Sequence, residues 1–471
     1  MTRHGGARGT LPGAGRFGVT ALLGVGIAAL ALLFTMCGAP PGGSEPYRGS
    51  KGATGAYGTP SVPSGKARAE LGWGFTHTEF SADDGEPAAG SRAEKLLSAQ
   101  PMPQNQHIMG WGADNPEPSP GRYDFAELDR RIAFVRRSGG TPVITLCCAP
   151  DWMKGGKAGR TDWSKERLET APAPEHYEDF AALAATVARR YPDVRHFIVW
   201  NEFKGFFDES RKRWNYEGYT RLYNLVHAAL KKVSKDILVG GPYVVMDSHP
   251  PGEDTYASGL SGPWGTADRR SLEAVTYWNE HKAGADFVVV DGSSYTRDDR
   301  LIPDEFAATD KLAAVGRWVR RTTGLPLWWA EWYVEPGDER DERDGWSERH
   351  RSAVQAAGVI AMARGGATTG FYWNPQKKGE RCAGCLWRST ELADGGSGLP
   401  MLKLLSRFAR EFPPGTRFRD VSVAADDKRN LKVLADDKAV LVVNTLDRKI
   451  AAKVDGHSFD LGPYGLRWLT R

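Results

Sequence analysis

The sequence contains little cysteine, which limits the chemistry it can carry. Only five of its 471 residues are Cys, and Cys382 and Cys385 form one Cys-x-x-Cys pair without a second pair at zinc-site spacing. A structural zinc site needs four converging ligands, so we expect no metal, and no motif indicates a cofactor. In an exported protein this pair would suit a disulfide, whereas Cys147 and Cys148 fit small buried positions.

The chain also lacks a strong net charge and an internal repeat. Its formal net charge is +4. This excess is too small to indicate a nucleic-acid partner, and no RNA- or DNA-binding motif is present. The sequence therefore predicts no nucleic-acid partner.

Long apolar runs are scarce, and the notable one lies near the start of the chain. Residues 17–35 are nearly all apolar or small and follow Arg3, Arg8 and Arg16. This pattern is typical of a secretory signal or of an uncleaved N-terminal membrane anchor, and the length of the run does not decide between them. Either segment would span residues 1–37 and would place the protein outside the cell or on its surface, with the anchor as a membrane tether. Residues 38–69, rich in Gly, Pro and Ser, predict a flexible linker.

From residue 70 to residue 410, candidate strands alternate with amphipathic helices. The expected strands are 71–77, 107–111, 142–147, 194–199, 237–241, 287–290, 327–330 and 369–373. The expected helices are 123–138, 177–191, 216–233, 272–282, 306–322 and 348–364. Eight strands separated by helices predict a parallel sheet closed into a (β/α)8, or TIM, barrel, which makes this an α/β protein. Two long loops, 246–270 and 334–346, would lie on the active-site rim. Residues 411–471 contain only short strands and predict a small C-terminal β-sandwich domain.

Two glutamates stand where barrel strands end. Glu202 follows the apolar run of the fourth strand, and Glu331 follows the seventh. Strand ends form the catalytic rim of such a barrel, and a pair of carboxylates is the usual machinery for cleaving a glycosidic bond. Either Glu alone could equally be a structural ion-pair partner. The pair, with Asn201 beside one Glu and tryptophans on both sides of the other, favours catalysis.

Aromatic and histidine side chains near other strand ends are candidates for sugar contacts. The chain has 16 Trp residues, and their flat rings suit stacking on sugars, although most tryptophans in a protein belong to its core. The candidate sugar-binding residues are Trp111, Trp152, Trp373, His77 and His249. Each tryptophan could instead belong to the core at the rim, and a histidine in such a loop more often has partners within the protein.

The sequences Trp200–Asn201–Glu202 and Trp329–Ala330–Glu331 resemble the large clan (clan A) of retaining (β/α)8 glycoside hydrolases. Within that clan the chain is most similar to glycoside hydrolase family 39, which includes β-xylosidases, α-L-iduronidases and some exopolysaccharide hydrolases. The resemblance implies that Glu202 is the acid/base, that Glu331 is the nucleophile and that Asn201 holds the sugar 2-hydroxyl. It also implies that Tyr295, beyond the sixth strand, donates a hydrogen bond to Glu331. The chain departs from the family in its second strand, where Gln106 and Met109 stand near the places of a family Arg and His.

Together these features predict an exported retaining glycosidase that acts on an oligo- or polysaccharide. Two alternatives remain open. A transglycosylase would form the same covalent intermediate but transfer the sugar to another sugar. A non-catalytic carbohydrate-binding protein would keep the tryptophans but would have no reason to keep both glutamates and Asn201.

Overall fold

The computed structural model describes residues 67–470 apart from 254, 337–344, 374, 378, 380–381 and 426. The predicted targeting segment and nearly all of the predicted linker lie outside these residues. Within the described part of the chain, no helix is long and apolar enough to cross a membrane.

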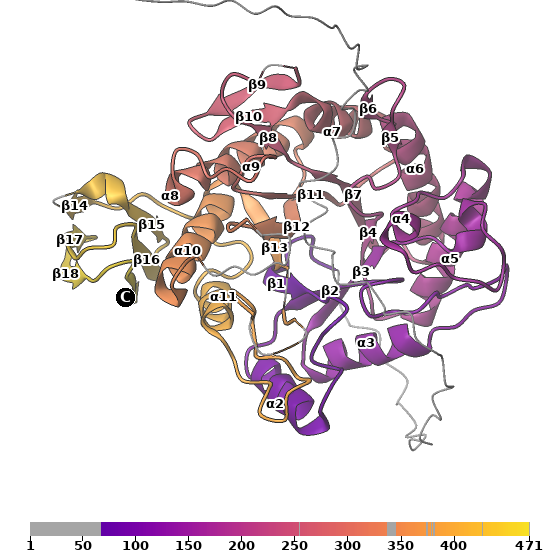
Figure 1. Cartoon of the computed structure of the whole chain (residues 1–471), viewed down its shortest axis with the longest axis horizontal. Helices are drawn as coiled ribbons and strands as arrows, with labels where there is room; N and C mark the ends of the chain where they lie inside the picture. The colour runs from indigo at the N-terminus through magenta and orange to yellow at the C-terminus, as the bar shows by residue number, and fades with distance from the viewer. Residues whose placement is uncertain are drawn as a thin grey trace, which may run out of the picture.

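Eight parallel strands close into a barrel, as the sequence predicts (Figure 1). Around the barrel the order is β1, β13, β12, β11, β7, β4, β3, β2, so each strand pairs with its neighbours in chain order. The barrel strands are β1 (Gly72–Thr76), β2 (Pro103–His107), β3 (Thr141–Leu146), β4 (His196–Val199), β7 (Leu238–Val245), β11 (Phe287–Ser293), β12 (Leu327–Tyr333) and β13 (Ala367–Tyr372). Because the strands are parallel, their carboxyl ends meet at one mouth.

The second strand lies earlier in the chain than predicted. The expectation of residues 107–111 is wrong, because β2 consists of Pro103–His107 with sequence Pro-Gln-Asn-Gln-His. All five residues are buried although four of them are polar. A search for an apolar run misses such a strand, in which Gln104, Asn105 and Gln106 donate hydrogen bonds inside the protein.

The barrel interior is layered. Its apolar layer consists of Val143, Ile198, Tyr243, Phe287, Val289, Trp328, Ala330 and Phe371. A polar layer is formed by Thr76, Asn105 and Thr145. Asn105 donates to the Thr76 hydroxyl (3.1 Å) and accepts from the Thr145 hydroxyl (2.8 Å). Thr76 in turn donates to the carbonyl of Ala330 on β12 (3.1 Å), so this layer joins four strands.

Helices surround the barrel in Figure 1. They are α2 (Pro87–Ser98), α3 (Ala126–Arg137), α4 (Lys165–Leu168), α5 (Tyr177–Arg190), α6 (Tyr216–Val233), α7 (Arg269–His281), α8 (Glu305–Ala308), α9 (Asp310–Thr323), α10 (Glu348–Arg364) and α11 (Pro400–Glu411). The bounds of α6 and α10 match the prediction. The helices α2 and α11 were not predicted from the sequence, and the predicted helix 306–322 is two helices, α8 and α9.

Much of the long rim segment after β7 is ordered. Strands β8 (Ser248–His249), β9 (Ala257–Gly262) and β10 (Gly265–Asp268) form a small antiparallel sheet in the order β8-β10-β9. The predicted rim loop 246–270 thus contains a small sheet that was not predicted, and its last two residues begin α7. The neighbouring strands β5 (Phe207–Asp208) and β6 (Arg213–Trp214) form a short hairpin. Most of the second predicted rim loop, 334–346, lies outside the described residues.

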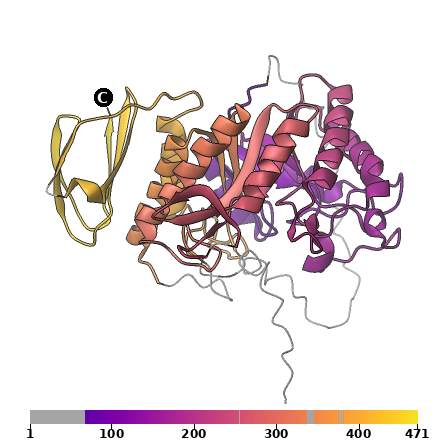
Figure 2. The same ribbon diagram turned by 90° about the horizontal axis from the view of Figure 1, so that it is seen from above.

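The C-terminal domain is built from two three-stranded antiparallel sheets. One contains β14 (Val423–Ala425), β17 (Ile450–Val454) and β18 (His457–Leu461), and the other β15 (Leu431–Ala435), β16 (Ala439–Asn444) and β19 (Leu466–Thr470). Strand β18 was not predicted. The domain stands beside α10 at one flank of the barrel (Figures 1 and 2).

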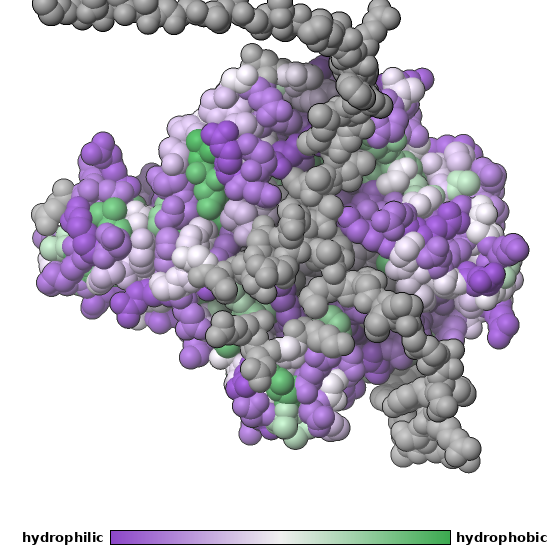
Figure 3. All heavy atoms as spheres, in the orientation of Figure 1, coloured by the Kyte–Doolittle hydropathy of each residue, from purple (hydrophilic) through white to green (hydrophobic). Residues whose placement is uncertain are grey.

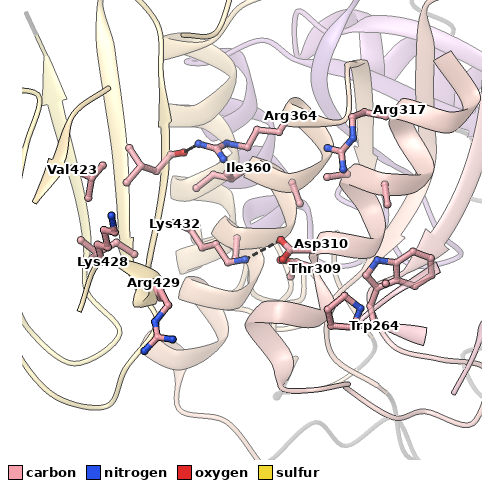
Figure 4. A pocket seen from close by; sticks show the side chains of 18 of the residues that line it. Trp264, Thr309, Asp310, Arg317, Ile360, Arg364, Val423, Lys428, Arg429 and Lys432 are labelled. Atoms are coloured by element: carbon pink, nitrogen blue, oxygen red, sulfur yellow. Dashed lines mark hydrogen bonds and ion pairs between the residues drawn. The ribbon is translucent and has the colours of Figure 1, made fainter. Parts of the chain in front are cut away.

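A cavity of about 620 Å³ lies where this domain meets the barrel. Two polar contacts cross the boundary there (Figure 4). Arg364 of α10 donates to the Val433 carbonyl (2.6 Å), and Lys432 pairs with Asp310 (2.9 Å).

On the face seen in Figure 3 the described surface is mainly hydrophilic, with apolar residues in small patches. Cys382 and Cys385 form a disulfide, while Cys147 and Cys148 are buried free thiols.

Candidate active site

Three buried carboxylates converge at the mouth of the barrel. Glu202 follows β4, Asp291 lies on β11 and Glu331 lies on β12. One oxygen of each lies within 4.8 Å of the others, and the three residues are at most 3% exposed. The two glutamates singled out in the sequence therefore face each other, as expected from their places at the carboxyl ends of two strands of one barrel.

Two β-bulges point the side chains of this site inward. On β12, Trp329 pairs with Val290 but Glu331 pairs with Asp291, so Ala330 is the extra residue. On β7, Pro242 pairs with Val289 and Val244 with Val290, which makes Tyr243 the extra residue. A bulge breaks the alternation of a strand and redirects the next side chain. This is why Glu331 faces the interior although Ala330, its neighbour, also does.

Glu331 accepts two phenolic hydrogen bonds. Tyr243 donates to its Oε1 (2.5 Å) and Tyr333 to its Oε2 (2.7 Å). Burial and then the charge of Glu202 raise the pKa of Glu331 to about 8, while Lys204 and the two tyrosines oppose that rise. The two phenols thus stabilise the ionised form of a carboxylate that burial would otherwise neutralise.

Glu202 is paired with a lysine from its own turn. The Nζ atom of Lys204 lies 2.6 Å from Glu202 Oε2 and 3.4 Å from Glu169 Oε1. Burial lowers the pKa of Lys204, but Glu202, Glu169 and Glu331 outweigh it and raise the pKa overall. The site therefore contains a permanent cation beside the glutamate that the sequence marks as acid/base.

The backbone around these residues adopts an unusual conformation. Nine non-glycine residues in the described part of the chain have positive φ, and five of them lie here. They are Trp111 (44°), Trp200 (67°), Glu202 (51°), Phe203 (55°) and Tyr243 (52°). Such conformations cost free energy and persist where the surrounding structure imposes them, which is frequently at functional sites.

Asn201 and His107 present buried polar atoms that are not engaged. Neither the amide atoms of Asn201 nor the ring nitrogens of His107 have a hydrogen-bond partner of good geometry among the described residues, although the two side chains lie close enough for Asn201 to oppose the fall in the pKa of His107. Burial and then the charge of Lys204 lower the pKa of His107 to about 3, so its ring is neutral. Buried polar groups in native proteins are nearly always satisfied, and these fit hydroxyl groups of a ligand.

An aromatic group stands over one side of the site. Tyr295, Tyr333 and Trp373 form a cluster with Trp111 packed against it. The ring of Trp111 lies 4.5 Å from that of His107, and the Lys204 ammonium is 5.5 Å from the Trp111 centroid. The predicted residues Trp111, Trp373 and Tyr295 are thus brought together. The donor role expected of Tyr295 belongs instead to Tyr243 and Tyr333, and Tyr295 packs beside Tyr333.

The remaining predicted sugar-binding residues lie among other partners. His77 is buried between Ser81 (2.5 Å) and Gln104 (2.8 Å). His249 is in the small sheet after β7, 3.0 Å from Asp268. The Trp152 indole donates to the Glu117 carbonyl (2.9 Å). The structure does not bring these three side chains to the carboxylates.

Several residues of the site were missed in the sequence. They are Lys204, His107, Tyr243, Asp291 and Tyr333. One signal was available, since Asp291 follows the apolar run Phe-Val-Val-Val just as Glu331 follows the apolar run Leu-Trp-Trp-Ala. The inward turn of Tyr243 depends on a bulge, which apolar alternation does not predict.

Comparison with known proteins supports the resemblance found in the sequence. No family model matches the chain. A β-xylosidase of Caldicellulosiruptor saccharolyticus is 31% identical over 139 residues, which is 27% of this chain and 27% of that enzyme. The matched segment thus spans about a quarter of the relative.

Two solved structures share the fold at low identity. A family 39 glycoside hydrolase from Bacteroides cellulosilyticus WH2 is 15% identical with a TM-score of 0.50, covering 85% of this chain and 79% of that one. SrfJ from Salmonella typhimurium is also 15% identical, with a TM-score of 0.54 and coverage of 86% and 90%. The chain is therefore a TIM-barrel protein that resembles clan A glycoside hydrolases and, among them, family 39.

Proposed function

We propose that this protein is a retaining glycoside hydrolase that cleaves an oligo- or polysaccharide through a covalent glycosyl-enzyme. The observation that carries the proposal is the separation of Glu202 and Glu331, whose nearest oxygens lie within 4.8 Å. Retaining enzymes hold their two carboxyl groups about 5–5.5 Å apart, whereas inverting enzymes leave about 6.5–9.5 Å for a water molecule.

In this proposal Glu331 attacks the anomeric carbon. A nucleophilic carboxylate must be ionised in a site from which water is excluded, and the hydroxyl groups of Tyr243 and Tyr333 meet that need. Both phenols bond the oxygens of Glu331 before substrate arrives, so the carboxylate is already oriented for attack.

Glu202 protonates the leaving oxygen and then removes a proton from water. The negative charge on Glu331 disappears when the glycosyl-enzyme forms, so Glu331 no longer repels a negative charge on Glu202 in the second step. Asn201 and His107, with their unengaged polar atoms, hold sugar hydroxyls. Trp111 and Trp373 supply the apolar side of the subsite.

The experiment that tests the proposal compares aryl glycosides on the wild type, Glu331→Gln and Glu202→Gln. A β-xyloside leads the panel, because the matched relative is a β-xylosidase. Glu331→Gln should abolish turnover of every substrate. Glu202→Gln should spare the first step for substrates with activated leaving groups, and azide should restore part of its turnover by replacing water as the attacking group.

Undiminished activity in both variants would contradict the assignment. Exposed Glu209, whose Oε2 lies 2.8 Å from Lys212 on the surface, provides a matched control. Glu209→Gln should behave as the wild type.

A transglycosylase is the second candidate, because it would use the same carboxylates. Product analysis with and without an added sugar acceptor separates the two activities. A protein that only binds carbohydrate would show no turnover in the wild type.

Export to the cell surface or medium is part of this proposal and is supported by the apolar segment 17–35. Fractionation of cells that express the full chain, with N-terminal sequencing of the product, distinguishes a cleaved signal from an anchor.

A further inference from the structure

Asp291, the third carboxylate, has no role in the reaction described above. It lies on β11 directly opposite Glu331 in the strand register. The side chain is 0% exposed. A mechanism with two carboxylates does not require Asp291. Burying its carboxylate nevertheless costs free energy.

The three carboxylates differ in the donors that stabilise them. Glu331 has two tyrosyl hydroxyls and Glu202 has the Lys204 ammonium. By contrast, neither oxygen of Asp291 meets a donor group among the described residues. A buried carboxylate without donors is the least favourable place for a negative charge.

The surrounding charges lead to the same conclusion. The titratable groups that interact with Asp291 are Glu202, Lys204, Tyr243, Lys311 and Glu331. The Lys311 ammonium donates a hydrogen bond to the Tyr295 carbonyl (2.9 Å), and burial lowers the pKa of Lys311 to about 8. Three buried carboxylates so close together do not all ionise.

Burial, and then the charge and hydrogen-bonding proximity of Glu202, raise the pKa of Asp291 well above its usual value. In the active form of the resting site, in which Glu331 is ionised, one proton therefore resides between Asp291 and Glu202.

We propose that Asp291 stores the proton that Glu202 delivers to the leaving group. Asp291 is then a positioning residue that acts through Glu202, and this inference rests on the proposed function. It explains how Glu202 serves as an acid although Lys204 stabilises its ionised form.

As Glu331 forms its bond to the anomeric carbon and the glycosidic bond breaks, Asp291 passes its proton to Glu202, and Glu202 passes a proton to the leaving oxygen. In the second step water attacks the anomeric carbon and the ester bond breaks. The proton of that water passes to Glu202, and a proton returns to Asp291.

This relay keeps the charge of the cluster constant. In the resting site Glu202 and Glu331 are negative and Asp291 is neutral. In the glycosyl-enzyme Glu331 is an uncharged ester and Asp291 is negative. The buried Lys204 therefore faces the same total charge in both states, which avoids the cost of changing charge in a low-dielectric site.

The test is Asp291→Asn, which keeps the size of the side chain but cannot release a proton. Cleavage of an alkyl xyloside, which needs an acid, should fall about 10²–10⁴-fold in kcat/KM, the range of general acid catalysis. A dinitrophenyl xyloside, whose leaving group needs little protonation, should change less than about tenfold. An equal loss on both substrates would indicate a merely structural role and overturn the inference.

Asp247→Asn is the matched control. Asp247 follows β7, and its pKa is raised by burial while Lys311 opposes the rise. Its amide variant should affect the two substrates equally. A preferential loss on the alkyl xyloside in this variant as well would contradict a specific role for Asp291.

A measurement on the wild type remains if Asp291→Asn does not fold. The rate with the alkyl xyloside is followed as D2O replaces H2O. Two protons in flight predict a curved dependence on the D2O fraction, and a straight line would overturn the relay. If Glu202→Gln does not impair alkyl xyloside cleavage, the proposed function itself fails. If it does, and Asp291→Asn has no effect, only this inference fails.

Discussion

Tyr243 reaches Glu331 because β7 contains one residue more than its neighbour requires. Removing its hydroxyl should make the ionised nucleophile less favourable. The hydrogen bond lowers the pKa of Glu331, so Tyr243→Phe should raise that pKa, and the ascending limb of the kcat/KM profile should move to higher pH. A hydrogen bond to a charged group contributes about 1.5–3 kcal/mol, which corresponds to a loss of roughly ten- to a hundredfold at neutral pH.

Tyr223→Phe is the control for this prediction. Tyr223 is also buried, but its hydroxyl donates to the Gly284 carbonyl (2.9 Å), on the flank of the barrel. Its variant should lose stability without a shift of the pH profile. A profile of Tyr243→Phe that coincides with the wild type would exclude the tyrosine from the ionisation of Glu331.

At this scale the sequence predicts the residues that follow strand ends and misses those that depend on local irregularity. Glu202 and Glu331 each end an apolar run, so their place at the barrel mouth follows from the barrel, although the inward direction of Glu331 also depends on the bulge at Ala330. Tyr243 required knowledge of a bulge, and Lys204 required the conformation of the turn after β4. His107 was visible but was placed at the start of a strand that it ends.

Among the elements, β7 leaves room at Gly240 for the ring of Phe287 on β11. A Cβ atom at Gly240 would lie 2.1 Å from a ring carbon of Phe287, its register partner. Gly240→Ala should therefore destabilise the barrel by about 1–3 kcal/mol through overpacking, measured as a lower urea midpoint.

Gly259→Ala is the control, since a Cβ there meets nothing within 4 Å. Its midpoint should stay close to that of the wild type. Equal midpoints for the two variants would show that β7 and β11 can separate without cost.

The alternation of strands and helices was enough to predict the barrel, because apolar runs separated by amphipathic helices permit few other arrangements. The elements that were missed or misplaced have other sequence signatures. Strand β2 is polar and buried, α2 begins at Pro87 in a stretch rich in small residues, and β18 is mostly exposed. In β18 the inward and outward positions therefore differ little in hydrophobicity.

For the molecule as a whole, two buried histidines predict sensitivity to acid. Burial and then Arg131 lower the pKa of His77 to about 4, and burial and then Lys204 lower that of His107 to about 3, from 6.5. Below pH 6.5 the unfolded chain binds protons that the folded chain does not. Stability is therefore fully present above that pH and falls as the pH drops towards 4.

The lowered pKa of His77 corresponds to a loss of roughly 3 kcal/mol once the pH falls below 4. Urea unfolding between pH 7 and pH 4 measures it. His77→Gln should flatten the slope, whereas His457→Gln, at an exposed site, should leave it unchanged. A slope that stays the same in His77→Gln would contradict the assignment.

The polar layer formed by Thr76, Asn105 and Thr145 joins four strands of the barrel. Apart from Tyr243, the side chains of the apolar layer do not enter the proposed chemistry. An engineer could therefore repack that layer for heat tolerance and alter the aromatic rim for a different glycan, provided that these three side chains and Tyr243 are retained.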